Sequence, residues 1–200
     1  MSYRILYISD WNEKINESKL KILSKFGDEI FTPDLDYINN RNIISSLSNN
    51  VDFDYNNLII GNMMGAYLAL YVSNITKIPS LLFNPSFYFK NGCELKSVYD
   101  QEQFPEKKIL LSAKHDIVDT RRTFKYLREL GYDNQLKVFE NLKTDIPIDI
   151  FEIYFKEFRE KYSNFDYPNK PKKDKKDIQK KTLGKKTPIM YVNFTTALRG

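Results

Sequence analysis

Short apolar runs alternate with longer helix-like stretches along the first 162 residues. Six runs are predicted as strands, and the continuous apolar ones among them are typical of strands buried on both faces. The six runs lie at residues 5–8, 29–33, 58–60, 80–83, 108–112 and 135–139. Five stretches carry helical periodicity or helix-end signals, at residues 18–26, 37–47, 63–75, 120–130 and 147–162. This alternation predicts an α/β fold: a three-layer sandwich whose mainly parallel central sheet is covered by helices on both faces.

Local signals mark several of the predicted helix ends. Ser18 is the candidate N-cap of the first helix, and Gly131 follows the last apolar position of the helix at 120–130. In the final helix, Phe151, Phe155 and Phe158 fall at spacings that share one face. That helix is therefore predicted to pack against the sheet.

The segment Gly61-Asn62-Met63-Met64-Gly65 lies where a predicted strand turns into a helix. Glycines two residues before and two residues after an apex have the spacing of the nucleophile elbow, G-x-S-x-G. In that turn the apex serine attacks the substrate, but here the apex is Met63. A thioether cannot be deprotonated and cannot act as the nucleophile of acyl transfer. The segment thus predicts the geometry of an elbow without its chemistry.

Four patches resemble the small YqiA-type bacterial esterases of the α/β-hydrolase fold, over about residues 4–162. Residues 5–12 are similar to the family's L-Y-L-H-G-F-N, and the elbow together with residues 78–85 is similar to its G-S-S-L-G-G-Y and L-P-A-V-x-x-N-P-A. Residues 111–119 resemble the strand and loop of the catalytic acid, and residues 138–144 lie where the family has E-G-G-N-H. The resemblance implies an α/β-hydrolase-like domain over residues 1–162.

The resemblance also implies a degenerate catalytic triad. It places the nucleophile at Met63, the acid at Asp116 and the histidine at or near Thr144, and no histidine follows His115. Asp10 stands near the expected oxyanion hole, where its carboxylate would repel a developing oxyanion. Loss of serine or histidine alone removes most triad catalysis. We therefore expect no catalytic residues, and a pseudoenzyme rather than a working esterase.

Two other functions remain open. One is an ester hydrolase with a non-standard site around His115 and Asp116, although adjacent residues usually point apart and Asp116 is better explained as the cap of the next helix. The other is a small-ligand-binding regulatory protein that keeps a pocket beneath Met63. Asp10 and Trp11 would face that pocket, although Trp11 is better explained as packing.

The basic residues are concentrated near the end of the chain. The formal net charge is +5, and residues 168–200 contain ten Lys and Arg against two Asp, which gives +8 there and −3 elsewhere. Residues 163–200 are predicted to form an extended Lys-rich tail, because such a sequence buries too little apolar surface to fold alone. Its lysines suit phosphates or acidic surfaces as point charges, so non-specific nucleic-acid binding through Lys170 to Lys186 is open. The densest run contains Lys172, Lys173, Lys175 and Lys176.

Residues 188–198 turn apolar and β-prone again, as in a docking peptide at the end of a flexible segment. The residues expected to make the apolar contact are Ile189, Tyr191, Phe194 and Leu198. We therefore expect a structural or interaction subunit of a larger assembly, such as a virion or another nucleoprotein complex. The tail would hold it to other protein subunits.

The composition argues against several other classes. The single cysteine, Cys93, excludes an intramolecular disulfide, and no CxxC or HExxH spacing suggests a metal site. No P-loop or GxGxxG segment occurs, so we expect no cofactor. No stretch approaches the roughly 20 apolar residues of a membrane span, and the first residues lack a signal-peptide layout. The expected location is cytoplasmic, including a virus particle assembled there, and not secreted or membrane-bound.

Overall fold

Strands and helices alternate throughout the computed structural model, which describes residues 3–11, 13–26, 28–37, 42–49, 51, 57–88 and 106–162. The first half contains β1 (Arg4–Ile8), α1 (Glu17–Ser24), β2 (Glu29–Phe31), α2 (Ile43–Asn49), β3 (Asn57–Asn62) and α3 (Met64–Thr76). The second half contains β4 (Ser80–Phe83), β5 (Lys107–Ser112), α4 (Thr120–Glu129), the 3-10 turn η1 (Asp133–Gln135), β6 (Leu136–Phe139) and α5 (Ile148–Lys161). Each corresponds to a predicted element, except for η1.

A six-stranded sheet in the order β2-β1-β3-β4-β5-β6 forms the centre of the described fold. All five neighbouring pairs are parallel, which confirms the predicted sheet. The chain passes from β1 outward to β2 and then returns to β3 on the other side of β1. The strand order therefore reverses between β1 and β3. At such a switch point, α/β proteins bind ligands beyond the carboxyl ends of the strands.

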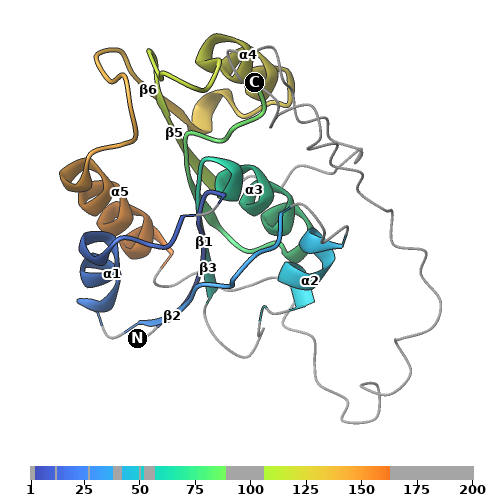
Figure 1. The fold of residues 1–200 in the computed structure, drawn as a ribbon, viewed down its shortest axis with the longest axis vertical. Coiled ribbons are helices and arrows are strands. Elements are labelled where there is room, and N and C mark those ends of the chain that lie inside the picture. Colours follow the sequence, from blue (N-terminus) through green and yellow to red (C-terminus); the bar gives the residue numbers. More distant parts are fainter. Residues whose placement is uncertain are drawn as a thin grey trace.

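Helices cover both faces of the sheet, as Figure 1 shows: α1 and α5 lie on one side, and α2 and α3 lie on the other. Successive side chains of a strand point to opposite faces. In β1, Ile5 and Tyr7 pack with α1 and α5, whereas Leu6 and Ile8 pack with α2 and α3. The continuous apolar runs of the sequence thus supply two cores, one for each face of the sheet.

Two predicted helix caps are wrong. The Asn16 side chain accepts a hydrogen bond from the Lys19 N–H (2.8 Å), so α1 begins one residue before the predicted cap Ser18, which lies within the helix. The Asp119 side chain caps α4 through the Arg122 N–H (3.1 Å), and Asp116 lies too far upstream to reach that turn. The stop at Gly131 is confirmed, because this residue has a φ of 82°.

A buried ion pair ties α5 to the β1–β2 edge of the sheet. The Arg159 guanidinium donates to both carboxylate oxygens of Asp28, at 2.9 and 3.0 Å. Asp28 also accepts a hydrogen bond from the Tyr3 N–H (2.9 Å), and its side chain is fully buried. The Arg159 guanidinium lies over the Tyr3 ring, 4.9 Å from its centroid. Residues 131 positions apart in the sequence are thereby joined.

Within the described residues, every helix is too short or too polar to cross a bilayer. Cys93 and the predicted tail, residues 163–200, lie outside the described residues. The cytoplasmic location and the roles of the tail therefore stay predictions.

Candidate functional site

The turn from β3 into α3 has the geometry predicted for a nucleophile elbow. Met63 is the single residue between the two elements, and its backbone has φ 51° and ψ −115°, a conformation that residues with a side chain rarely adopt. The Met63 N–H donates to the Phe83 carbonyl (2.9 Å), and the Met63 carbonyl accepts from the Tyr67 N–H (3.1 Å). These bonds hold the strained apex between the neighbouring strand and the first turn of the helix.

The glycines on either side of the apex are required by close packing. A Cβ on Gly61 would lie 2.5 Å from the Ala66 Cα. A Cβ on Gly65 would lie 2.1 Å from the Ile8 carbonyl oxygen and 2.3 Å from the Ser9 carbonyl oxygen. The helix therefore begins in direct contact with the end of β1, which explains the glycine spacing seen in the sequence.

The Met63 side chain at the apex is packed rather than presented to solvent. It is 5% exposed, and its sulfur lies 3.8 Å from the Ser86 hydroxyl, which donates toward it. Ser86 is itself buried, and its N–H donates to the Met63 carbonyl (3.3 Å). The position that would hold an attacking oxygen in a serine hydrolase is thus filled by an apolar side chain.

The Asp10 carboxylate accepts a hydrogen bond from the backbone N–H of Met64, the residue after the apex. The acceptor is its Oδ1, at 3.0 Å. In an elbow enzyme, the N–H of the residue after the nucleophile contributes to the oxyanion hole. Burial raises the pKa of Asp10, while the Met64 and Trp11 N–H groups oppose that shift. Met63 offers no side-chain cap, so Asp10 also caps α3.

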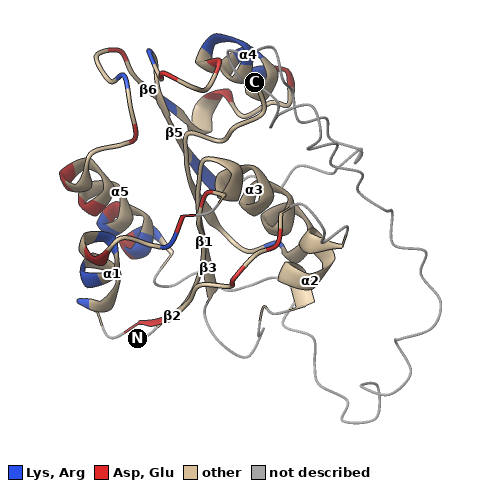
Figure 2. Cartoon of the chain, in the orientation of Figure 1, with Lys and Arg blue, Asp and Glu red and all other residues tan. Residues whose placement is uncertain are grey.

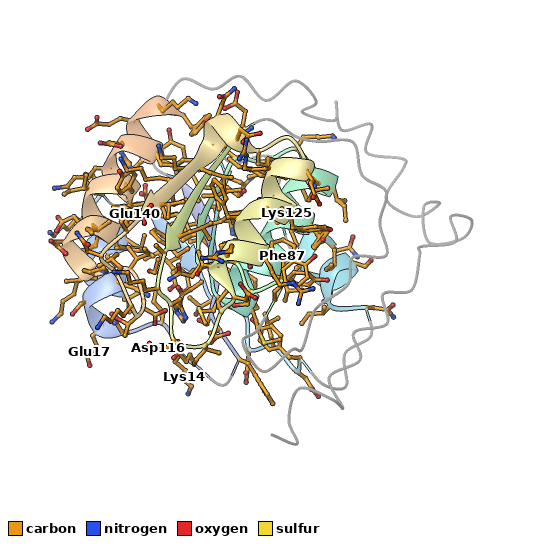
Figure 3. The ribbon with its side chains drawn as sticks, turned by 90° about the horizontal axis from the view of Figure 1, so that it is seen from above. Lys14, Glu17, Phe87, Asp116, Lys125 and Glu140 are labelled. Carbon is orange, nitrogen blue, oxygen red and sulfur yellow. The ribbon has the colours of Figure 1, made fainter. Side chains whose placement is uncertain are left out.

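His115 and Asp116 face different surroundings. His115 is 4% exposed, and its Nδ1 accepts from the N–H groups of Ile117 and Val118, both at 3.2 Å. Its Nε2 faces the Asp145 Oδ1 at 3.6 Å, just beyond direct hydrogen-bond length. Asp116 is exposed, and Figure 3 shows it at the periphery of the molecule. The partner of the histidine is therefore Asp145 rather than its sequence neighbour.

The other predicted triad position does not join this arrangement. Thr144 is exposed in the loop between β6 and α5. Its neighbour Asp145 has a lowered pKa, first because the carboxylate faces His115 and further because Lys19 lies nearby. The sequence analysis missed Asp145, although it directly follows the predicted histidine position. Trp11 packs against the core on the α3 side, as predicted.

Two adjoining clefts open at the carboxyl ends of β1 and β2, with volumes of about 560 and 330 Å³. Both are lined by Ser9, Asp10, Glu13 and Lys14. The larger one extends along residues 32–37 and the smaller one reaches Tyr7, Lys19 and Asp145. In the described part of the chain, no cluster of His, Cys, Asp and Glu has the arrangement of a metal site. The predicted contact residues of the tail, from Lys172 to Leu198, lie outside the described residues.

Comparison with solved structures identifies the fold. A protein from Xanthomonas campestris pathovar campestris, described as a putative hydrolase of the alpha/beta superfamily, matches with a TM-score of 0.53 and 12% identity, over 70% of this chain and 87% of that one. An α/β serine hydrolase without a lid, also from Xanthomonas campestris, matches with a TM-score of 0.53 and 11% identity, over 81% and 84% of the two chains. No protein-family model matches the chain, and no curated protein matches it by sequence. The chain therefore has the α/β-hydrolase fold, and the resemblance to YqiA-type esterases stays a prediction.

Proposed function

We propose that this protein is a catalytically inactive α/β-hydrolase-fold protein that acts by binding, as a subunit of a larger assembly. The observation that carries the proposal is the elbow: a buried thioether replaces the nucleophile, and the Asp10 carboxylate covers the Met64 N–H. A negative charge at this N–H competes with the oxyanion that the elbow would otherwise stabilise. The two features remove separate parts of the same mechanism.

A hydrolase site around His115 and Asp116 gains no support from the geometry. Asp116 is exposed at the periphery, and the His115 Nδ1 is occupied by the Ile117 and Val118 N–H groups, while its buried Nε2 makes no hydrogen bond with a described residue. A general base must reach a nucleophile within hydrogen-bond distance. The imidazole instead stabilises the turn after β5 and faces Asp145.

The test is hydrolysis of p-nitrophenyl acetate, together with labelling by a fluorophosphonate that reacts with activated serines. We expect the purified chain to show neither above a heat-denatured sample, while an active α/β serine hydrolase shows both. Met63→Ser should remain unlabelled, because Thr144 supplies no base and Asp10 still covers the Met64 N–H. Stoichiometric labelling of the unchanged chain would show that a working nucleophile and base are present, and the proposal would fail. Labelling of Met63→Ser alone would show that only the nucleophile is missing.

The proposal places the assembly contacts in the tail. The support comes from the sequence: a charge of +8 in residues 168–200, followed by an apolar, β-prone end. Such a segment binds through long-range attraction from the lysines and a short apolar contact at Tyr191 and Phe194. A virion or nucleoprotein particle is the kind of assembly that such a tail would suit.

A further inference from the structure

Basic residues gather on α4, whose charge is opposite to that of the domain around it. The helix contains Arg121, Arg122, Lys125 and Arg128, with Glu129 as its single carboxylate. Its net charge is therefore +3, whereas residues 1–167 together carry −3. Figure 2 shows the basic residues along α4, while acidic and basic residues alternate on α1 and α5. Neither the elbow nor the tail accounts for this surface.

The stability of the helix does not explain its first arginines. Arg121 and Arg122 lie in the first turn of α4, where the helix dipole disfavours cations. The buried face of the helix is formed by other residues, among them Thr123 and Leu127. Arg121 is exposed and forms no ion pair with a described carboxylate. A residue that opposes helix stability in this way is expected where binding determines the sequence.

An open cleft of about 410 Å³ runs along α4. It is lined by Arg121, Phe124, Lys125, Arg128, Glu129 and Asp133. Its three cations follow one another at spacings of four and three residues, so they form a row on one side of the helix, about 10 Å long. Lys125 pairs with Glu129 at 3.9 Å and Arg128 pairs with Asp133, but all four side chains are more than half exposed. Such exposed pairs are weak, so a bound polyanion can replace these carboxylates.

Phe124 gives the basic cleft an aromatic wall. The ring is partly buried against the core on the α3 side, and the Arg128 guanidinium lies 5.5 Å from its centroid. Unpaired bases stack on aromatic rings and on guanidinium planes, while the phosphates between them pair with cations. An acidic peptide would use the cations alone. The combination therefore favours single-stranded nucleic acid over an acidic protein surface.

We propose that the α4 cleft binds single-stranded nucleic acid. Arg121, Lys125 and Arg128 pair with successive phosphates of one strand, and a base lies against Phe124. At about 3.4 Å per nucleotide of a stacked strand, the row of cations has room for about three phosphates. This binding is separate from that of the tail, because it uses side chains of the folded domain.

The test is fluorescence anisotropy of the full chain with a labelled oligothymidylate of about 16 nucleotides, the upper end of the length that one binding site covers. Binding is measured over a range of salt concentrations for the triple variant Arg121→Gln, Lys125→Gln, Arg128→Gln. The slope of log K against log salt should fall by about 2, since each lost phosphate contact on a single strand removes about 0.7. An unchanged slope would overturn the proposal.

A second triple variant, Lys21→Gln, Lys143→Gln, Lys156→Gln, is the matched control. It removes the same charge from exposed positions of α1, the β6–α5 loop and α5. The slope should stay that of the unchanged chain. If both triple variants lose the same affinity and slope, only the net charge matters, and the assignment to α4 is wrong.

Phe124→Leu tests the aromatic contact. Leucine keeps an apolar side chain against the core but removes the ring, so binding should weaken about tenfold, the effect of losing one stacked base. The salt slope should not change, because no charge is lost. An unchanged affinity would show that no base stacks there and would overturn the proposal.

Polyglutamate distinguishes nucleic acid from an acidic protein surface. At equal charge it should displace the labelled oligomer only in part, because it offers no base to Phe124. Displacement as complete as that by the unlabelled oligomer would mean that the cleft takes any polyanion, and the proposal would fail.

Discussion

Single residues at the carboxyl edge of the sheet determine what this fold can do. Met63 keeps the strained backbone of the elbow but fills its apex with a buried thioether. Met63 gives α3 no side-chain cap. A single hydrogen bond from the Met64 N–H to Asp10 both caps the helix and leaves that N–H occupied. Within the α/β-hydrolase fold, Met63 thus serves packing and Asp10 serves helix capping.

Lys107 is a buried cation whose titration can be measured. It is 4% exposed at the start of β5, and burial, with a further contribution from Lys77, lowers its pKa to about 7. The unfolded chain keeps this proton up to a pKa of about 10.4, so it binds more protons than the folded chain above pH 7. Stability should therefore increase with pH between these two values, and be lowest below pH 7.

Lys107→Met should be more stable than the unchanged chain at pH 6, with the difference shrinking as the pH rises to 9. Urea unfolding at several pH values measures this difference in the free energy of unfolding. Lys137→Met, at an exposed position of β6, should show no such pH-dependent gain. A pH-independent difference for Lys107→Met would mean that the lysine stays charged in the fold.

At the scale of elements, α5 is held to the sheet by the Asp28–Arg159 pair. Arg159→Met should destabilise the fold by about 3–5 kcal/mol, because it leaves the fully buried Asp28 carboxylate without its counter-ion. Lys156→Met on the same helix breaks an exposed pair with Glu152, which keeps its pair with Lys25, and should change stability far less. Urea unfolding of both variants makes the comparison.

A double variant separates lost charge pairing from lost helix packing. Asp28→Asn combined with Arg159→Met removes the uncompensated charge, while the amide oxygen of the substituted side chain would still accept the Tyr3 N–H. Most of the stability should therefore return. If the double variant is as unstable as Arg159→Met alone, the arginine acts mainly through its stacking on Tyr3 and Phe26.

The elements were predictable from local sequence, because apolar runs and glycine spacing report burial and tight turns directly. The elbow at Met63 is the best example, since its glycines are required by contacts within 2.5 Å. The side-chain contacts of the candidate site were not predictable in the same way. Asp10 reaches a backbone group 54 positions away, and His115 faces Asp145 rather than the adjacent Asp116. Such pairings depend on how distant strands and loops meet, which no local pattern records.

At the scale of the whole molecule, every core residue in the described part of the chain lies at or before Tyr162. We therefore expect a chain ending at Tyr162 to keep the urea midpoint of the full chain. The same truncation should abolish recovery of the assembly partners in a native pull-down that uses the full chain as the reference bait.

Within the full chain, Tyr191→Ala with Phe194→Ala should weaken this association more than Lys172→Ala with Lys173→Ala, because buried aromatic residues usually dominate an interface. Added salt should weaken the association of the Tyr191→Ala, Phe194→Ala variant further, because salt screens the attraction from the lysines that this variant keeps. Unfolding of the chain that ends at Tyr162 would instead make the tail a structural part of the domain.

The all-parallel sheet also has a kinetic consequence. Among the described strands, no two neighbours can pair through a hairpin, so each of these pairs forms only after a crossover segment has closed behind it. In particular, β1 cannot meet β3 until the intervening α1, β2 and α2 have been synthesised. Loop-closure entropy must be offset before these contacts contribute, which places such sheets among slow folders with high contact order. During that interval β2 can pair with one edge of β1, but the apolar faces of β1 stay exposed until α1 and α5 pack on one of them and α2 and α3 on the other.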